Sequence, residues 1–387
     1  MKITHIHIER FRGCQNEDVD VGSLLTAIAG QNGTQKSTLL GIITQTFTLK
    51  TEDSMRVEKP LCGGSYISAF KDKFRLSPTF DKPKGHEWTI SFDAGMDDFT
   101  VESIKRTGDP NVRFWKKGAR QEGDGYISFP TIFLSLKRLV PVAEEAKIIT
   151  DDTLLTQEEL NEFKQLHNKI LIAQTPISSA TTITSKNKQS IGVSTELYDW
   201  NQNSMGQDNL GKIILALFSF KRLHDKYPRQ YKGGILAIDE MDATMYPASQ
   251  VELLKVLRKY ASKLNLQILF TTHSMSLLKA MDDLVQEVTK KEETANQAKI
   301  LYLKKVDDKI AIKQGVNFKG IQLDLNVVAE GNNRKKNRIT AYTEDKENIL
   351  FVKAILKNKG FGVEFVECNI TWYKFNEICN KKELLLY

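Results

Sequence analysis

The segment from Gly30 to Thr38, Gly-Gln-Asn-Gly-Thr-Gln-Lys-Ser-Thr, constrains the fold of this chain more than any other feature. The residues before it, Leu24 to Ala29, predict a buried strand, and the leucine-rich and β-branched residues from Ser37 to Phe47 predict a helix. A glycine-containing turn between a strand and a helix gathers backbone N–H groups at the positive end of the helix dipole. We therefore expect this segment to hold phosphate, as in the P-loops of α/β proteins.

The positions in this segment have distinct expected tasks. Lys36 would reach the β- and γ-phosphates of ATP, and Ser37 would place its hydroxyl on Mg²⁺. Gln35 departs from the usual motif, which has glycine before the lysine, and a non-glycine residue at positive φ costs about 1–2 kcal/mol. Binding should survive this departure, whereas the hydrolysis rate is an open question. The predicted nucleotide-binding residues are Gln31, Asn32, Gly33, Thr34, Gln35, Lys36, Ser37 and Thr38.

A second apolar strand, Gly234 to Asp239, ends in the carboxylates of Asp239 and Glu240. Asp239, at the strand tip, is expected to hold Mg²⁺ through water, and Glu240 to polarise the attacking water as a general base. Acidic residues after a strand are unremarkable by themselves. Their combination with a phosphate-binding segment favours the catalytic interpretation.

Two further motifs lie at the ends of predicted elements. Ser204-Met205-Gly206-Gln207-Asp208 precedes an amphipathic helix from Leu210 to Tyr227, so a hydroxyl, a glycine backbone and a helix N-terminus form a second anion-binding corner. His273 follows a buried strand, Leu266 to Thr271. Because strands alternate with helices in this half of the chain, we expect a parallel or mixed sheet.

In this order, the motifs resemble the ATPase head of ABC-type proteins of the SMC/Rad-fifty-like and OLD families, over about residues 1 to 310. Residues 204–208 resemble the ABC signature motif, and His273 resembles the switch histidine that senses γ-phosphate. Asp242 occupies the D-loop position and is expected at a dimer interface. The opening hairpin, Glu9 to Gly13, is similar to the first hairpin of those heads, in which Arg12 would lie close to nucleotide.

The resemblance implies an ATPase with ATP and Mg²⁺ as cofactors and with Glu240 and His273 as catalytic residues. It also implies a head-to-tail dimer or a higher oligomer with two sandwiched nucleotides. In such a dimer, Ser204, Gly206 and Gln207 of one protomer would contact the nucleotide of the other.

We expect an ATPase domain over residues 1–330, with a β-rich lobe at about 60–135 and a helical insertion at about 151–200. About 170 residues separate Lys36 from Ser204, too few for an SMC coiled coil. Thr156 to Glu159 forms a capping-box pattern that predicts a helix start. The segment from Ser178 to Ser190 lacks periodicity and is interpreted as a flexible loop.

Residues 331–387 form the second predicted domain, a β-α-β unit after a basic linker that contains Arg334 and Arg338. Its Glu344 follows a predicted strand and resembles the metal-binding glutamate of TOPRIM domains. TOPRIM nucleases require an Asp-x-Asp motif after this glutamate, and none follows it in this sequence. We therefore favour a shortened or vestigial TOPRIM-like segment over an active nuclease.

Composition adds only weak constraints. The net charge of +7 permits contact with nucleic acid without demonstrating it, and the four cysteines lack zinc-site spacing. His5 and His7 share a strand face, which we interpret as an exposed face and not as a metal site. No apolar run is long enough to span a membrane and no signal peptide is expected, so a cytoplasmic location follows by default.

The stretch from Phe133 to Pro141 resembles one in PtuA, the ATPase subunit of Septu-type and retron-associated anti-phage systems. The leading hypothesis is therefore an ATPase switch that gates a nuclease partner of the HNH type, with DNA or a retron RNA/DNA complex as further partners. One alternative is an OLD-family enzyme whose own TOPRIM domain cuts DNA. Another is a scaffold that binds nucleotide and hydrolyses it poorly because of Gln35.

Overall fold

The structure is a computed structural model of the chain, and it divides the chain into two compact units, Met1–Gln322 and Leu323–Tyr387. The boundary falls within α7 (Phe318–Ala329). The structure describes all residues except 51, 67–72, 94, 106–111, 119–124, 141–147, 152, 186–188, 330–338, 344–345, 348, 351–353, 355–362 and 368–387.

A six-stranded sheet forms the centre of the first unit, with the strand order β16-β15-β3-β14-β13-β9. Neighbouring strands from β15 to β9 are parallel, and only β16 is antiparallel to its neighbour, so the expected mixed α/β sheet is confirmed. In sheet order, the strands are Lys309–Gln314, Ala298–Val306, Leu25–Gly30, Leu266–Thr272, Gly234–Ile238 and Thr131–Leu134.

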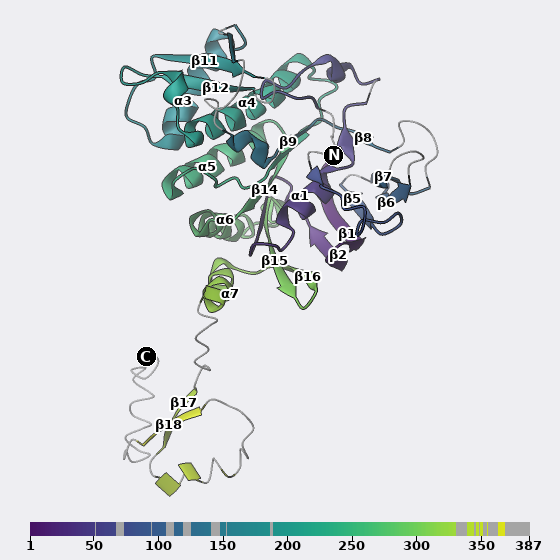
Figure 1. Cartoon of the computed structure of the whole chain (residues 1–387), viewed down its shortest axis with the longest axis vertical. Coiled ribbons are helices and arrows are strands. Elements are labelled where there is room, and N and C mark those ends of the chain that lie inside the picture. Colours follow the sequence, from purple (N-terminus) through teal and green to yellow (C-terminus); the bar gives the residue numbers. More distant parts are fainter. Residues whose placement is uncertain are drawn as a thin grey trace. The chain divides into compact units, whose positions relative to one another are not determined.

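Helices cover both faces of this sheet. Figure 1 shows α5 and α6 on one side, with α1 and a second sheet on the other. The helix α5 packs on β14, and α6 packs on β15 and β3. Among the described residues before α7, the α-helices are α1 (Lys36–Thr44), α3 (Gln157–Leu171), α4 (Met205–Lys226), α5 (Pro247–Lys263) and α6 (Met275–Val288).

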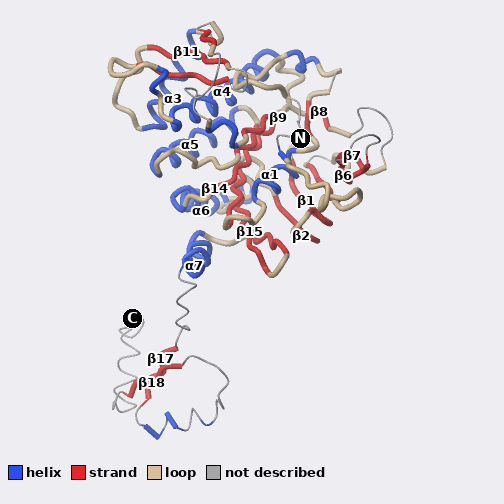
Figure 2. The backbone as a smooth tube through the Cα atoms, in the orientation of Figure 1, coloured by secondary structure: helices blue, strands red, loops and turns tan. Residues whose placement is uncertain are grey.

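The predicted β-rich lobe is confirmed as an antiparallel sheet with the order β2-β1-β5-β6-β7. Figure 2 shows these strands as a group beside α1. Its core joins that of the central sheet, because Ile8, Trp88, Leu39 and Leu269 belong to one buried cluster. Burial of each such side chain contributes about 1.5–3 kcal/mol. In sheet order, the strands are Cys14–Asp20, Ile3–Phe11, Glu87–Phe92, Phe99–Lys105 and Val112–Lys116.

The prediction of a flexible loop from Ser178 to Ser190 is wrong. Strands β11 (Ser179–Thr184) and β12 (Gln189–Ser194) pair there, and β10 (Ile149–Asp151) completes a three-stranded sheet. The β-branched threonine and isoleucine residues favour extended backbone, and packing of β12 on α4 supplies the burial that local periodicity does not reveal. The region predicted as a helical insertion thus combines α3 with strands.

The capping box of α3 is confirmed. Thr156 Oγ1 accepts a hydrogen bond from Glu159 N, and Glu159 Oε2 accepts one from Thr156 N. Two minor strands, β4 (Phe47–Thr48) and β8 (Ile127–Ser128), pair in parallel. No helix in the described part of the chain is long and apolar enough to cross a membrane.

In the second unit, β17 (Ile339–Thr343) and β18 (Val363–Glu367) form a parallel pair, which confirms both predicted strands. The predicted domain boundary at 330/331, the basic linker and Glu344 lie outside the described residues. The TOPRIM-like character of this unit therefore stays a prediction.

Candidate functional site

Four neighbouring parallel strands bring the predicted motifs to one edge of the central sheet. The strands β3, β14, β13 and β9 have the same direction, so their carboxyl ends meet at this edge. The segment that starts at Gly30 follows β3, His273 follows β14, and Asp239 follows β13. Ligands of open parallel sheets bind in the crevice outside the carboxyl ends of the strands.

The turn after β3 requires glycine at its start. Gly30 has φ +149°, and a Cβ atom there would lie 2.4 Å from the carbonyl oxygen of Leu303 in β15. Gly33 also has a positive φ, of +80°. Thr34 closes the turn, because its hydroxyl donates to the carbonyl oxygen of Gln31 at 2.8 Å. Asn32 lies exposed in this turn, and Thr38 lies in the first turn of α1.

Lys36 extends over the same turn. Its ammonium donates to the carbonyl oxygens of Gly30 at 3.1 Å and Gln31 at 2.9 Å. Burial lowers the pKa of Lys36, and the nearby charges of Glu240 and Asp239 act in the opposite direction. The lysine is thus a positive charge placed between the turn and the acidic end of β13.

Gln35 has a left-handed backbone, with φ 64° and ψ 30°, at the N-terminus of α1. A non-glycine residue is strained at positive φ, so Gln35 carries the backbone strain that was expected if this turn required a positive φ. Its side chain lies against Gly13, where a Cβ atom would approach Gln35 Nε2 to 2.8 Å. The opening hairpin thus touches the predicted phosphate-binding turn through Gly13.

Ser37 and Asp239 are the residues expected at Mg²⁺, and they are in direct contact. Ser37 Oγ donates to Asp239 Oδ1 at 2.8 Å. A hydroxyl and a carboxylate are hard oxygen ligands of the kind that Mg²⁺ prefers, so these residues fit the ion. The described residues contain no group of three or more His, Cys, Asp or Glu side chains that could hold a metal ion.

Thr271, at the end of β14, connects the carboxylate of Asp239 to the backbone of Glu240. Its hydroxyl donates to Asp239 Oδ1 at 2.7 Å and accepts a hydrogen bond from Glu240 N at 2.6 Å. Glu240 has φ +49°, which is unusual for a non-glycine residue. The carboxylate of Glu240 is thus carried by a strained turn whose start is fixed to β14.

Arg138 was missed by the sequence-based prediction. It is 2% exposed, and its guanidinium donates to the carbonyl oxygen of Glu240 at 2.7 Å and to Asn209 Oδ1 at 2.7 Å. The sequence signals there are a basic pair, Lys137 and Arg138, and the place of both residues in the stretch from Phe133 to Pro141. Which of these two side chains is buried depends on the orientation of the turn, and tertiary packing decides that orientation.

The signature-like segment begins α4. Ser204 is the N-cap and accepts a hydrogen bond from Gln207 N at 3.3 Å, while Gln207 Oε1 accepts one from Ser204 N at 2.8 Å. Gly206 lies against the turn after β13, because a Cβ atom there would be 2.5 Å from the carbonyl oxygen of Thr244. Glycine is therefore required where these two backbones meet.

His273 and Asp242 lie beside each other within one chain. The backbone N–H of His273 donates to Asp242 Oδ1 at 3.3 Å. The pKa of His273 is lowered by burial and by the charge of Lys36, and the nearby acidic residues partly offset this. The neutral imidazole is thus favoured next to the predicted phosphate site.

Arg12 is held by the β-rich lobe. Its guanidinium forms a two-point pair with Asp81, with Nε to Oδ1 at 3.1 Å and Nη2 to Oδ2 at 3.0 Å. Although burial acts to raise it, hydrogen bonds from Arg12, Ser77 and His86 hold the pKa of Asp81 at about 2. The structure thus places Gly13 against Gln35 of the predicted phosphate-binding turn and pairs the Arg12 guanidinium with Asp81, so a contact of Arg12 with nucleotide stays a prediction.

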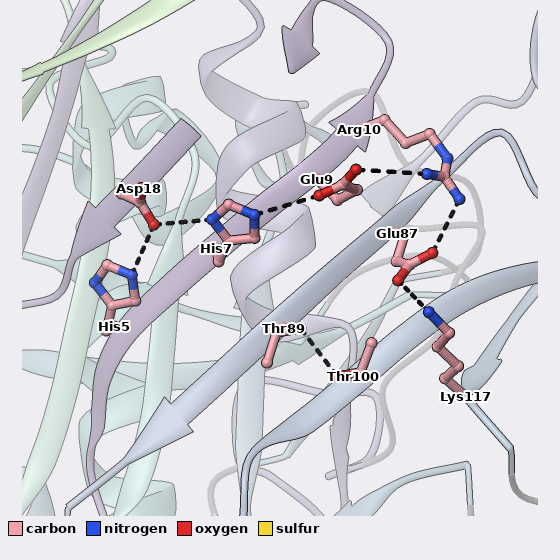
Figure 3. A network of polar contacts seen from close by, with 9 residues as sticks. All are labelled: His5, His7, Glu9, Arg10, Asp18, Glu87, Thr89, Thr100 and Lys117. Carbon is pink, nitrogen blue, oxygen red and sulfur yellow. Dashed lines mark hydrogen bonds and ion pairs between the residues drawn. The ribbon is translucent and has the colours of Figure 1, made fainter. Parts of the chain in front are cut away.

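His5 and His7 lie on an outer strand face, as Figure 3 shows. His5 Nε2 and His7 Nδ1 both lie within 3.0 Å of Asp18 Oδ1, and His5 Nδ1 lies 2.9 Å from Asp20 Oδ1. Both side chains are partly exposed. The two histidines thus belong to an ion-pair network on this partly exposed strand face.

The chain is similar to a known protein family and to several solved structures. A family model described as an AAA ATPase domain matches residues 1–189 and 136–278 of the chain. No curated protein matches the chain. The following solved structures are similar to it. The SMC head domain from Thermotoga maritima is 13% identical with a TM-score of 0.44, and the match covers 82% of this chain and 100% of that one.

Two more SMC head structures were found. An SMC head bound to the C-terminal winged-helix domain of ScpA is 14% identical with a TM-score of 0.49, over 83% of this chain and 100% of that one. An SMC head with an extended coiled coil, bound to the C-terminal domain of ScpA derived from Pyrococcus furiosus, is 13% identical with a TM-score of 0.45. That match covers 85% of this chain and 99% of the other.

Proposed function

The chain belongs to the AAA ATPase domain family, and from that premise we propose that it is an ATP-binding and ATP-hydrolysing switch of the ABC type. The observation that carries the proposal is the edge of the central sheet. There, Ser37 bonds to Asp239, and Glu240 and His273 lie beside them. This order of residues at the carboxyl ends of parallel strands suits a nucleotide with its metal ion.

Each residue has a defined task in this proposal. Lys36 would bind phosphate oxygens, and Ser37 with Asp239 would hold Mg²⁺. The bound ion would neutralise charge on the β- and γ-phosphates. Glu240 accepts the proton of the attacking water, and His273 donates a hydrogen bond near the γ-phosphate.

We further propose that two chains dimerise head to tail around ATP. The support is the start of α4, where Ser204 and Gly206 present a helix N-terminus of the kind that binds anions. Gln31, Asn32, Gly33, Thr34 and Thr38 would line the nucleotide of the same chain, and Gln207 and Asp242 would complete the contact between chains. Hydrolysis would release the two heads.

Steady-state ATP hydrolysis tests this proposal. Turnover should fall by at least about 100-fold in Lys36→Ala and Glu240→Gln, the size of effect expected when a transition-state contact or general base is removed. Lys255→Ala and Glu252→Gln, which change an exposed ion pair on α5, are matched controls and should leave turnover unchanged. ATP binding without turnover in the wild type would instead favour the nucleotide-bound scaffold.

Dimerisation needs a separate measurement. Glu240→Gln should accumulate as a dimer with ATP and Mg²⁺ in analytical ultracentrifugation. Met205→Arg should remain monomeric, because Met205 is exposed between Ser204 and Gly206 and a long charged side chain there would block the contact. A monomer for Glu240→Gln at saturating ATP would overturn the head-to-tail dimer.

The biological setting that we propose is anti-phage defence, with the ATPase state gating an HNH-type nuclease partner. The support is the resemblance of the segment around Phe133 to Val140, described above, together with the compact head. Cells that carry the chain with its flanking genes should resist phage, and Lys36→Ala should abolish that resistance. Equal plating of phage on both strains would contradict this setting.

The proposed role of Glu344 in a TOPRIM-like segment is tested by DNA cleavage. The purified chain should not cut plasmid DNA in Mg²⁺ or Mn²⁺ if the segment is vestigial. Cleavage that is lost in Glu344→Ala would favour the OLD-type nuclease.

A further inference from the structure

The side chain of Arg138 is buried at the junction of three segments of the candidate site. It lies in the short 3₁₀ helix η2 (Leu136–Leu139), directly after β9. A guanidinium has five N–H donors in a rigid fork, so it can satisfy several fixed acceptors at once. Its acceptors are the carbonyl oxygens of Leu134 at 3.3 Å, Ser135 at 3.1 Å and Glu240 at 2.7 Å, and Asn209 Oδ1 at 2.7 Å.

Arg138 and Asn209 together hold both ends of the turn after β13. Arg138 bonds to the carbonyl oxygen of Glu240, at the first residue of the turn. Asn209 Nδ2 donates to the carbonyl oxygen of Ala243 at 3.0 Å, at the other end. Because Arg138 and Asn209 also bond to each other, the two contacts form one connected clamp.

The turn between these contacts needs such support. Its first residue, Glu240, has φ +49°, and Thr244, just after Ala243, has φ +67°. Non-glycine residues in this region of φ are strained and persist only where surrounding contacts hold them. The turn carries the carboxylate that the proposed mechanism uses as a base.

Asn209 also ties this turn to the start of α4. It is fully buried in the second turn of the helix that begins with the signature-like segment. Gly206, one turn earlier, lies against the backbone of Thr244. A shift of the start of α4 therefore cannot occur without a shift of the turn that bears Glu240, because the two backbones meet without intervening side chains.

A purely structural role explains the arginine poorly. Burial lowers the pKa of Arg138 to about 10, against the opposing charges of Asp239, Glu240 and Asp242. A buried charge is often no more stabilising than a well-packed apolar side chain of the same size. The guanidinium bonds both to Glu240 and to Asn209, which lie in two segments that the proposed mechanism uses. These two bonds give a reason for arginine at this position.

We propose that Arg138 is a positioning residue that couples the start of α4 to Glu240 through Asn209. The proposal rests on the proposed function, in which the start of α4 meets the nucleotide of a second chain. Arg138 itself touches no substrate. When the start of α4 is held by that contact, the clamp sets the carbonyl of Glu240, and thereby its carboxylate, in the orientation for proton transfer.

A double-mutant cycle tests the coupling. The variants are Arg138→Met, which keeps the side-chain length without donors, Asn209→Ala, and the two combined. Arg222→Met is the matched control, since Arg222 lies on α4, as Asn209 does, but pairs with Glu159 and the carbonyl oxygen of Leu154. The readouts are kcat, KM for ATP and Tm.

We expect kcat to fall about 10- to 100-fold in Arg138→Met, the effect of losing hydrogen bonds from a charged group, with KM within about 2-fold of wild type. The double variant should be no slower than Arg138→Met, because both changes break one clamp. Arg138→Lys should recover part of the loss. Arg222→Met should keep the wild-type kcat.

Three results would overturn the coupling. They are an unchanged kcat in folded Arg138→Met, losses that multiply in the double variant, and an equal loss of kcat in Arg222→Met. If Arg138→Met fails to fold, kcat is measured for Arg138→Lys instead. This variant retains the positive charge but cannot bond to both Glu240 and Asn209, so its kcat should still fall below that of wild type.

A measurement that needs no turnover separates this inference from the proposed function. Amide hydrogen exchange of residues 240–244 should be faster in both Arg138→Met and Asn209→Ala than in wild type and Arg222→Met. If the wild type does not hydrolyse ATP, the proposed function fails, and the exchange result still decides whether the clamp exists. Unchanged exchange in Asn209→Ala would overturn it.

Discussion

Ser37 Oγ lies 2.8 Å from Asp239 Oδ1 and donates a hydrogen bond to it, although the two residues are 202 positions apart in the sequence. Thr271 donates to the same carboxylate oxygen. The hydroxyls of Ser37, in α1, and of Thr271, in β14, therefore both donate to one oxygen of Asp239, the residue after β13. This contact ties the helix after β3 to the end of β13 and defines where the proposed Mg²⁺ would lie.

Ser37→Ala should raise the Mg²⁺ concentration needed for ATP hydrolysis. The variant removes one expected ligand of the ion and leaves Asp239 in place. We expect the half-saturating Mg²⁺ concentration to rise about tenfold, which corresponds to about 1.4 kcal/mol. A titration of turnover against Mg²⁺ at fixed ATP measures this, with Ser54→Ala, a change in the exposed short helix η1 (Ser54–Val57), as the control. An identical Mg²⁺ requirement in both variants would contradict the assignment of Ser37.

Thr271→Val should reduce both stability and turnover. Valine keeps the shape of threonine but leaves the N–H of Glu240 without its hydroxyl acceptor, which costs about 1–3 kcal/mol in a buried site. Because the same change frees the start of the turn that carries Glu240, kcat should also fall. Urea unfolding and steady-state kinetics measure the two effects.

Thr26→Val is the matched control for this prediction. Thr26 is fully buried in β3, and its hydroxyl accepts a hydrogen bond from Gly22 N at 2.9 Å, away from the carboxylates. It should lose stability to a similar extent and keep its kcat. If the two valine variants lose kcat equally, Thr271 has no special place at the site.

Gln35→Gly should stabilise the chain. Relief of the left-handed backbone is worth about 1–2 kcal/mol, and the greater freedom of glycine in the unfolded chain offsets about 0.5–1 kcal/mol of this. The net gain is about 1 kcal/mol. Gln35→Ala removes the same amide group but keeps the strained φ, so it should show no such gain in urea unfolding.

Turnover in Gln35→Gly addresses the scaffold alternative. If the side chain of Gln35 slows hydrolysis, the glycine variant should turn over faster than wild type at saturating ATP. A slower glycine variant would show that Gln35 supports hydrolysis.

Stability should decrease below pH 6.5 because of His167. Burial lowers its pKa in the folded state to about 4, whereas an unfolded histidine titrates near 6.5. Between these values, the unfolded chain binds a proton that the folded chain does not. The free energy of unfolding should therefore fall, by up to about 1.4 kcal/mol per pH unit from this group, as the pH decreases from 6.5 to 4.

Urea unfolding between pH 7.5 and 5 tests this linkage. His167→Leu should lose less stability than wild type over that range, and His224→Gln, a change of an exposed histidine on α4, should follow the wild type. Parallel pH profiles for all three proteins would contradict the buried neutral state of His167.

The elements with strong periodicity were predictable from sequence, as α3 illustrates. Its capping box at Thr156 and its apolar period specify a helix start without any tertiary contact. The hairpin that contains Ser179–Thr184 was not predictable, because its burial comes from β10 and α4, which are distant in sequence or weakly patterned.

The sequence by itself determined the chemistry of the site, since Lys36, Ser37, Asp239, Glu240 and His273 follow strands in an order that implies a shared edge. Local backbone preferences and hydrophobic patterning are properties of short segments, so they are readable from sequence. Only the tertiary structure decided that Gln35 adopts a left-handed backbone, that Arg12 pairs with Asp81, and that Arg138 is buried against Glu240. The contacts of Arg12 with Asp81 and of Arg138 with Glu240 join residues far apart in the chain, and their free energy depends on packing that no local pattern encodes.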